Sequence, residues 1–66
     1  MKNTIRVERA KLNISQSELA EQVQVSKQTI HSIETGRFVP STLIALKMAR
    51  YFKVSVESIF ELEEGD

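Results

Sequence analysis

The side chains best suited to chemistry in this 66-residue chain lie between Ser26 and Gly36. A helix over this stretch, turning about 100° per residue, places Ile30 and Ile33 on one side. The opposite side spans about 140° and holds only hydrogen-bonding groups. We call it the acid-free face, and it consists of Lys27, Gln28, His31, Ser32 and Thr35. Such a face can bind a polar partner, although an ordinary solvated helix face is the alternative interpretation.

The composition argues against catalysis. The chain has one His, no Cys and two Gly, so it offers neither a thiolate metal site nor a disulfide framework. No nucleophile–base pair, catalytic carboxylate pair or metal cluster can be assembled. We therefore expect no enzyme activity, cofactor, metal or small-molecule ligand. No apolar run reaches the length of a membrane span and no signal peptide is evident, so we expect a cytoplasmic protein without a membrane partner.

The charge is zero overall but unevenly distributed. Residues 1–53 carry nine basic and four acidic side chains, whereas residues 54–66 carry five acidic side chains and no basic one. A basic body with an acidic tail, residues 61–66 in particular, suits a polyanionic partner held on one side. A merely solubilising terminus fits the charges equally well.

The helices that position the acid-free face can be placed from their capping residues. A first helix reaching about Leu12 follows a cap at Asn3 or Thr4. Ser15 and Glu18 have the spacing of a capping box, which predicts the start of a second helix. A turn of about three or four residues separates that helix from Ser26, the cap of the third. Two short helices joined in this way form a helix-turn-helix, here residues 15–35 within a single domain of residues 1–66.

A fourth helix follows a cap at Ser41 and reaches about Phe52. It is apolar around most of its circumference, and so small a domain cannot bury every side of such a helix. We therefore expect a homodimer, with interface candidates among Ile44, Met48, Tyr51, Phe52, Ile59 and Leu62, some of which must instead belong to the monomer core. Ser55 predicts a short fifth helix over residues 56–60, and residues 60–62 could form a short strand.

These segments resemble the Cro/repressor-type, or xenobiotic-response-element, helix-turn-helix family. The resemblance rests on ISQSELAEQVQVSKQTIHSIETGRFVPS and on the later ALKMARYFKVSVESIF. It covers nearly the whole chain and implies an all-α, five-helix lambda-repressor-like domain. The short length is similar to single-domain repressors of the cytolysin-repressor type, which bind operators as two-fold dimers.

The resemblance also implies roles for individual residues. The third helix would enter the major groove of double-stranded DNA, with Lys27, Gln28, Ser32 and His31 as candidates for base contacts. Phosphate contacts would come from Gln16, Ser17, Thr29, Thr35 and Arg37, and Gln16 could also brace Gln28. Arg9 and Glu34 occupy the positions of the family's structural ion pair.

Two positions depart from the family pattern. Gln24 stands in the turn where Gly is frequent, and Glu8 stands where Leu is common. The expected function is a sequence-specific DNA-binding transcriptional regulator, a repressor acting on a pseudo-palindromic operator. The alternative is an antitoxin that uses the same fold and docks a toxin through its fourth helix.

Overall fold

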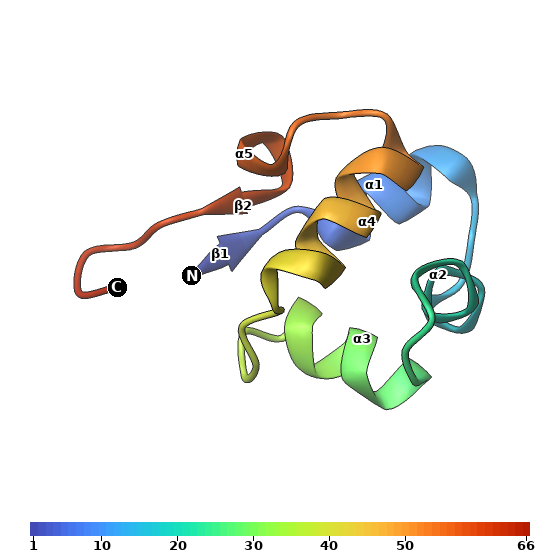
Figure 1. Cartoon of the computed structure of the whole chain (residues 1–66), viewed down its shortest axis with the longest axis horizontal. Coiled ribbons are helices and arrows are strands. Elements are labelled where there is room, and N and C mark those ends of the chain that lie inside the picture. Colours follow the sequence, from blue (N-terminus) through green and yellow to red (C-terminus); the bar gives the residue numbers. More distant parts are fainter.

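The computed structural model describes all residues from Met1 to Asp66 and contains five helices and two short strands. In chain order the elements are β1 (Lys2–Asn3), α1 (Ile5–Leu12), α2 (Gln16–Val23), α3 (Lys27–Glu34), α4 (Thr42–Phe52), α5 (Val56–Ile59) and β2 (Phe60–Glu61), as shown in Figure 1. The predicted fold class and the short C-terminal strand are confirmed, whereas strand β1 was not expected. No helix is long and apolar enough to cross a membrane.

Four of the five helices begin at the predicted serine. Ser15, Ser26, Ser41 and Ser55 each accept a hydrogen bond from the amide three residues further on. At α2 the Glu18 carboxylate also accepts from the Ser15 amide, which completes the capping box. Helix α1 begins differently, because the Thr4 side chain makes no capping bond. The side-chain oxygen of Asn3, Oδ1, accepts from the Ile5 amide instead, at 3.2 Å.

The four longer helices end in the same way. Asn13, Gln24, Gly36 and Lys53 all have left-handed backbones, with φ values of 55°, 62°, 80° and 60°. In each case the amide of the next residue returns to a carbonyl in the last turn of the helix, which is a Schellman ending. Only Gly36 adopts this backbone without a steric cost, since a left-handed conformation costs other residues about 1 kcal/mol. Gln24 therefore carries the strain expected of a non-glycine residue in the turn.

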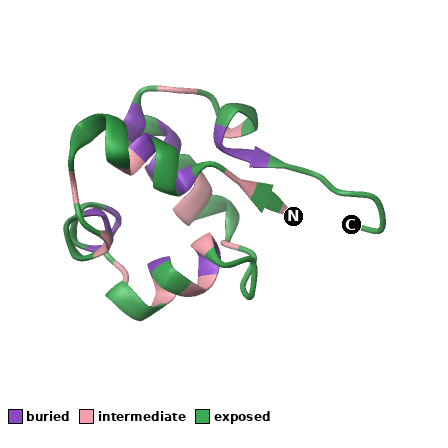
Figure 2. Ribbon diagram, turned by 180° about the vertical axis from the view of Figure 1, so that it is seen from behind, coloured by how far each residue is buried: buried purple, intermediate pink, exposed green.

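Helix α4 runs through the middle of the fold, where it packs against α2 and α5 (Figure 1). Its buried side is the stripe of Met48, Ala49 and Phe52, and the opposite side exposes Leu43 and Leu46. The buried positions gather on the inner faces of the ribbon in Figure 2. The remaining core side chains come from every other helix and from β2, namely Ile5, Leu19, Ala20, Val23, Ile30, Ile33, Ile59 and Phe60.

This burial corrects the predicted dimer interface. Met48, Phe52 and Ile59 are 0%, 8% and 1% exposed within one protomer, so their side chains are not available to a second copy. Ile44 and Tyr51 are half-buried against the core, and Leu62 is exposed. The sequence of α4 is apolar on nearly all sides, and only its packing against α2 and α5 distinguishes the inner stripe from the outer one.

The two ends of the chain lie together. Strands β1 and β2 pair antiparallel, with Lys2 opposite Glu61. The Met1 ammonium lies 3.0 Å from a Glu63 carboxylate oxygen and 3.3 Å from one of Asp66. Hydrogen bonds to Glu63 and then to Asp66 raise the pKa of the ammonium above 8.0. The Glu63 amide, followed by the ammonium, lowers the pKa of the Asp66 carboxyl below 3.8.

Candidate nucleic-acid interface

Helices α2 and α3 pack directly against each other and form the predicted helix-turn-helix (Figure 1). Ala20 is 3% exposed in α2, and its small side chain is suited to a close approach of the two helices. The carbonyl of Ala20 accepts from the Val25 amide at 3.0 Å, which closes the turn. The Lys47 ammonium donates to the Gln24 side-chain oxygen at 2.7 Å. The turn is thereby tied to α4 as well as to α2.

The acid-free face points away from the core, as the helical pattern predicts. Ile30 and Ile33 are 0% and 1% exposed on the inner side of α3. Lys27, Gln28 and His31 are exposed and Ser32 is half-buried. The side chains of Lys27, Gln28 and Ser32 make no hydrogen bond within the chain, so they are free to bind a partner.

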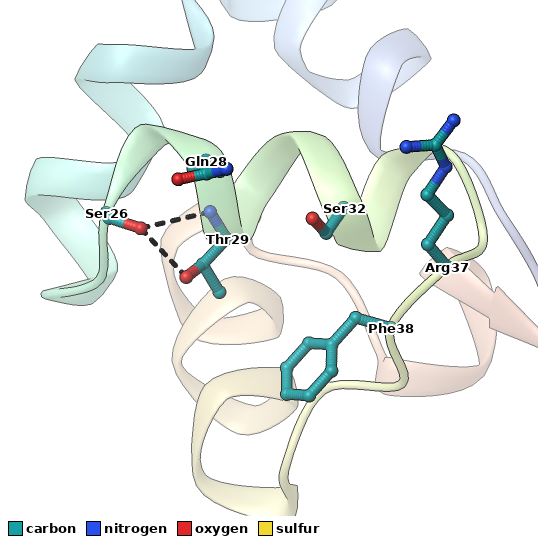
Figure 3. A pocket seen from close by; sticks show the side chains of 6 residues that line it. All are labelled: Ser26, Gln28, Thr29, Ser32, Arg37 and Phe38. Atoms are coloured by element: carbon teal, nitrogen blue, oxygen red, sulfur yellow. Dashed lines mark hydrogen bonds between the residues drawn. The ribbon is translucent and has the colours of Figure 1, made fainter.

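A hollow of about 410 Å³ lies between this face and the loop that follows α3 (Figure 3). Its polar lining comes from Ser26, Gln28, Thr29, Ser32 and Arg37. The sixth lining residue is Phe38, which is 52% exposed. The sequence analysis did not single out Phe38. An aromatic residue in a short loop before Pro40 would ordinarily be assigned to the core.

The C-terminal end of α3 is held by an ion pair. Arg9 Nε lies 2.7 Å from Glu34 Oε2, and Arg9 Nη2 donates to Glu34 Oε1 at 3.2 Å. A third guanidinium nitrogen donates to the carbonyl of Ile14 at 3.0 Å. The Arg9 side chain is 15% exposed and that of Glu34 is 2% exposed. This is the bidentate, largely buried geometry in which an arginine–carboxylate pair is strongest. The pair therefore fixes α3 against α1.

Gln16 completes this arrangement, but with partners other than the expected one. Its amide nitrogen donates to Glu34 Oε1 at 3.3 Å and lies 3.3 Å from Nδ1 of His31. The prediction that Gln16 braces Gln28 is therefore wrong for the free protein. A carboxylate next to Arg9 is the stronger acceptor, and it draws the Gln16 amide toward the end of α3. The Gln16 amide already donates to Glu34, so a phosphate must either compete for that hydrogen or bind the one beside His31.

The candidate phosphate-binding residues lie on both sides of the acid-free face. Ser17 is exposed in the first turn of α2, and Arg37 is exposed beyond the end of α3. The hydroxyl of Thr29 is 2.9 Å from that of Ser26, next to the start of α3. The hydroxyl of Thr35 donates to the carbonyl of His31 at 2.9 Å. Ser17 and Arg37 are thus the two whose side chains are unoccupied in the free protein.

Asn3 is a further positioning residue that the sequence analysis placed only as a possible helix cap. Its amide nitrogen donates to the carbonyl of Ile33 at 3.0 Å and to that of Glu34 at 3.4 Å. These are carbonyls of the last turn of α3, which a helix leaves without internal partners. The contact spans 30 residues, and no local pattern in the sequence could reveal it.

Comparison with known proteins agrees with this geometry. The model of the helix-turn-helix family HTH_3 matches residues 5–59, from the first residue of α1 to the last residue of α5. The chain belongs to this family. An uncharacterised HTH-type transcriptional regulator of Bacillus subtilis, YgzD, is 45% identical over 64 residues and 97% of each chain. One of Methanocaldococcus jannaschii is 42% identical over the full length of both. One of Archaeoglobus fulgidus is 42% identical over all of this chain and 93% of its own.

Glu8, where the family commonly has Leu, is buried in this member. The residue is 8% exposed, and its carboxylate accepts from the Lys11 ammonium at 3.1 Å. The Lys11 side chain is 64% exposed, so it reaches back over α1 to neutralise the buried acid. The spacing of three residues on one helix makes this contact possible.

Proposed function

We propose that this protein is a sequence-specific DNA-binding transcriptional regulator that inserts α3 into the major groove. The observation that carries the proposal is the acid-free face itself, which points outward while Arg9, Glu34 and Asn3 hold the rest of α3 in place. A rigid helix with free donors and acceptors is what direct readout of base edges requires. The names of the relatives, all HTH-type transcriptional regulators, support the same function.

Lys27, Gln28 and Ser32 are the proposed base-contacting residues. Lysine donates to O6 and N7 of guanine, and glutamine pairs with N6 and N7 of adenine, each good pair being worth about 1–3 kcal/mol of discrimination. The serine hydroxyl can donate or accept, so it can bind either base. We also assign His31 to the groove, where its exposed Nε2 edge is free while Nδ1 faces Gln16.

Backbone contacts would come from residues on both sides of α3. We assign Ser17 and Gln16 at the start of α2 to one strand, and Arg37 and Thr35 beyond α3 to the other. Thr29 lies next to Ser26 at the start of α3 and is assigned to the first strand. These contacts position the helix without specifying sequence, and they make binding fall with salt by a log–log slope of about −0.9 per phosphate neutralised.

We further propose that the protein binds as a homodimer. An apolar groove of about 250 Å³ lies beside the start of α4, and its hydrophobic lining is Met1, Val39, Ala45, Leu46, Val56 and Phe60. Val39 and Leu46 are 62% and 55% exposed, and Leu43 next to them on α4 is 60% exposed. A second copy covering this groove would present two α3 helices to half-sites about 34 Å apart on a pseudo-palindromic operator.

Repression by occlusion follows from that arrangement, because a dimer across a promoter excludes the polymerase from the same DNA. The alternative, an antitoxin, uses the same apolar groove for a toxin. Light scattering of the purified chain distinguishes them. A mass of two chains that returns to the mass of one in Leu46→Lys supports the homodimer, provided that the control Glu21→Lys, at an exposed position of α2 that does not line the groove, stays dimeric. A chain that stays monomeric at high concentration favours the alternative.

The test of DNA binding is selection from a random duplex library, which reports half-site, spacing and symmetry together. Lys27→Ala and Gln28→Ala should each lose preference at a single base pair, whereas Gln22→Ala on α2 should not. Arg37→Ala should weaken all sequences alike and lower the salt slope by about 0.9, with Arg50→Ala as the matched control. Equal binding to selected and scrambled duplexes would contradict sequence-specific regulation. Transcription from a promoter overlapping the selected site then tests repression.

A further inference from the structure

Phe38 is the one apolar side chain beside the acid-free face, and no role has yet been given to it. It is 52% exposed and is not part of the core cluster. It lines the hollow opposite Gln28 and Ser32, as Figure 3 shows. An exposed aromatic ring has an unfavourable contact with water, which a partner can relieve by covering the ring.

The backbone holds Phe38 in place relative to α3. The amides of Arg37 and Phe38 both donate to the carbonyl of Ser32, at 2.9 Å and 3.2 Å. Gly36 supplies the left-handed turn that allows this return, with φ of 80°. Pro40 and the helix cap Ser41 follow soon after, so only Val39 separates Phe38 from the residues that begin α4. The ring is therefore carried by α3, in a defined place beside Ser32.

Phe38 lines the hollow on the DNA side of this loop, and it also borders a small cavity that it shares with Val39 and Pro40. The apolar groove beside α4 is lined by Val39, the next residue, but not by Phe38. Conversely, the hollow beside α3 is lined by Phe38 but not by Val39. Of the two residues, only Phe38 borders the hollow beside α3, and only Val39 borders the apolar groove. A partner in the hollow would therefore contact Phe38, whereas a second copy in the groove would contact Val39.

The base edges in the major groove offer one apolar group, the C5 methyl of thymine. We propose that Phe38 contacts a thymine methyl and so determines specificity at one position of each half-site. This position lies next to the base read by Ser32, because both side chains line the same hollow. The proposal rests on the proposed function. It adds a base-contacting residue that makes no hydrogen bond to the base, and a thymine recognised by its methyl group.

The test compares wild type with Phe38→Ala on the duplex chosen by library selection, with each thymine replaced in turn by deoxyuridine, which lacks the methyl. Burying one methyl group changes affinity about fourfold. We expect wild type to lose about that factor at one thymine per half-site, and Phe38→Ala to lose nothing further there. Phe38→Leu, which keeps an apolar side chain, should retain part of the preference.

Two results would overturn the proposal. If Phe38→Ala weakens every duplex equally and deoxyuridine has no effect on wild type, the ring contacts sugar and not base. If Phe38→Ala keeps the full thymine preference, another residue reads that methyl. Both results apply only if the wild-type protein selects a DNA sequence. If it selects none, the proposed function is contradicted, and not only the role of Phe38. Circular dichroism and an unchanged preference at the Lys27 position show that the Phe38→Ala variant is folded and bound in the same way.

Discussion

Replacing Arg9 by methionine tests whether the ion pair holds α3 in place. Methionine replaces the aliphatic part of the arginine side chain but removes two of the three hydrogen bonds that the Glu34 carboxylate accepts. That carboxylate is 2% exposed, so water cannot replace the lost donors. Removing one partner of a buried pair costs about 3–5 kcal/mol. Arg9 is 15% exposed, which places this case at the lower end, about 3 kcal/mol.

Such a loss is large for a chain of this size. At 0.05–0.15 kcal/mol per residue, the whole domain is stable by about 3–10 kcal/mol. Arg9→Met should therefore lower the melting temperature by about 12–24 °C and shift the urea midpoint at an unchanged slope. Circular dichroism measures the melting temperature on heating and the urea midpoint at 25 °C. Arg6→Met is the matched control, since Arg6 lies on the same helix, is exposed and has no ion-pair partner, and it should change stability by less than about 0.5 kcal/mol.

The double variant Arg9→Met/Glu34→Leu separates two explanations of that cost. If the cost comes from a carboxylate left buried without its partner, removing the carboxylate as well should restore stability to within about 1 kcal/mol of wild type. If the two changes simply add, the interaction energy between the two side chains is zero, and the cost of Arg9→Met comes from its other contacts, such as the hydrogen bond to the Ile14 carbonyl. A cost below about 1 kcal/mol for Arg9→Met alone would refute the reasoning, because the pair would then behave like an exposed one.

Three further outcomes are expected. Lys53→Gly should raise stability by about 1 kcal/mol in thermal unfolding, because Lys53 holds a left-handed backbone, whereas Lys53→Ala should not raise it. Ser15→Ala should cost about 1 kcal/mol in urea unfolding, since the capping box of α2 is lost. The contact of Met1 with the tail should hold between about pH 4 and pH 8. The raised pKa of the ammonium means that its contribution is lost as pH rises through that pKa, and the lowered pKa of Asp66 means that its contribution is lost as pH falls through it. The NMR shift of the Glu63 amide, which donates to Asp66 at 2.7 Å, should move at both ends of this range, and an Asp66→Asn variant should remove the acidic step.

Local features of the fold could be predicted because their causes are local. A serine before an apolar helix period starts four of the five helices, and each bond spans three residues. The outward direction of the acid-free face follows from the placement of Ile30 and Ile33 on the helix. The Arg9–Glu34 pair spans 25 residues, and it could be anticipated only through the resemblance to a known family.

Features that depend on packing could not be predicted in the same way. Leu43 and Met48 are equally apolar, but one is 60% exposed and the other fully buried, and the position of α2 and α5 decides between them. Leu12 lies two helical turns after the buried Ile5, but it is 48% exposed, whereas the charged Glu8 is 8% exposed. The partners of Gln16 depend on where Glu34 lies in space. The proposed base and phosphate contacts depend on the sequence and shape of a DNA partner, which no pattern within the chain encodes.

The place of Asn3 has a consequence for the energetics of assembly. From β1, Asn3 holds the last turn of α3. Its strand partner Phe60, and Met1 just before β1, line the apolar groove proposed for a second copy. A partner that orders β1 therefore also orders the end of α3. By thermodynamic linkage, if dimerisation tightens DNA binding through the ordered α3, then DNA must tighten dimer association by the same factor. The ratio of the dimer dissociation constants measured without and with operator gives this coupling factor. Asn3→Ala, which removes the hydrogen bonds between β1 and α3, should reduce the factor toward one.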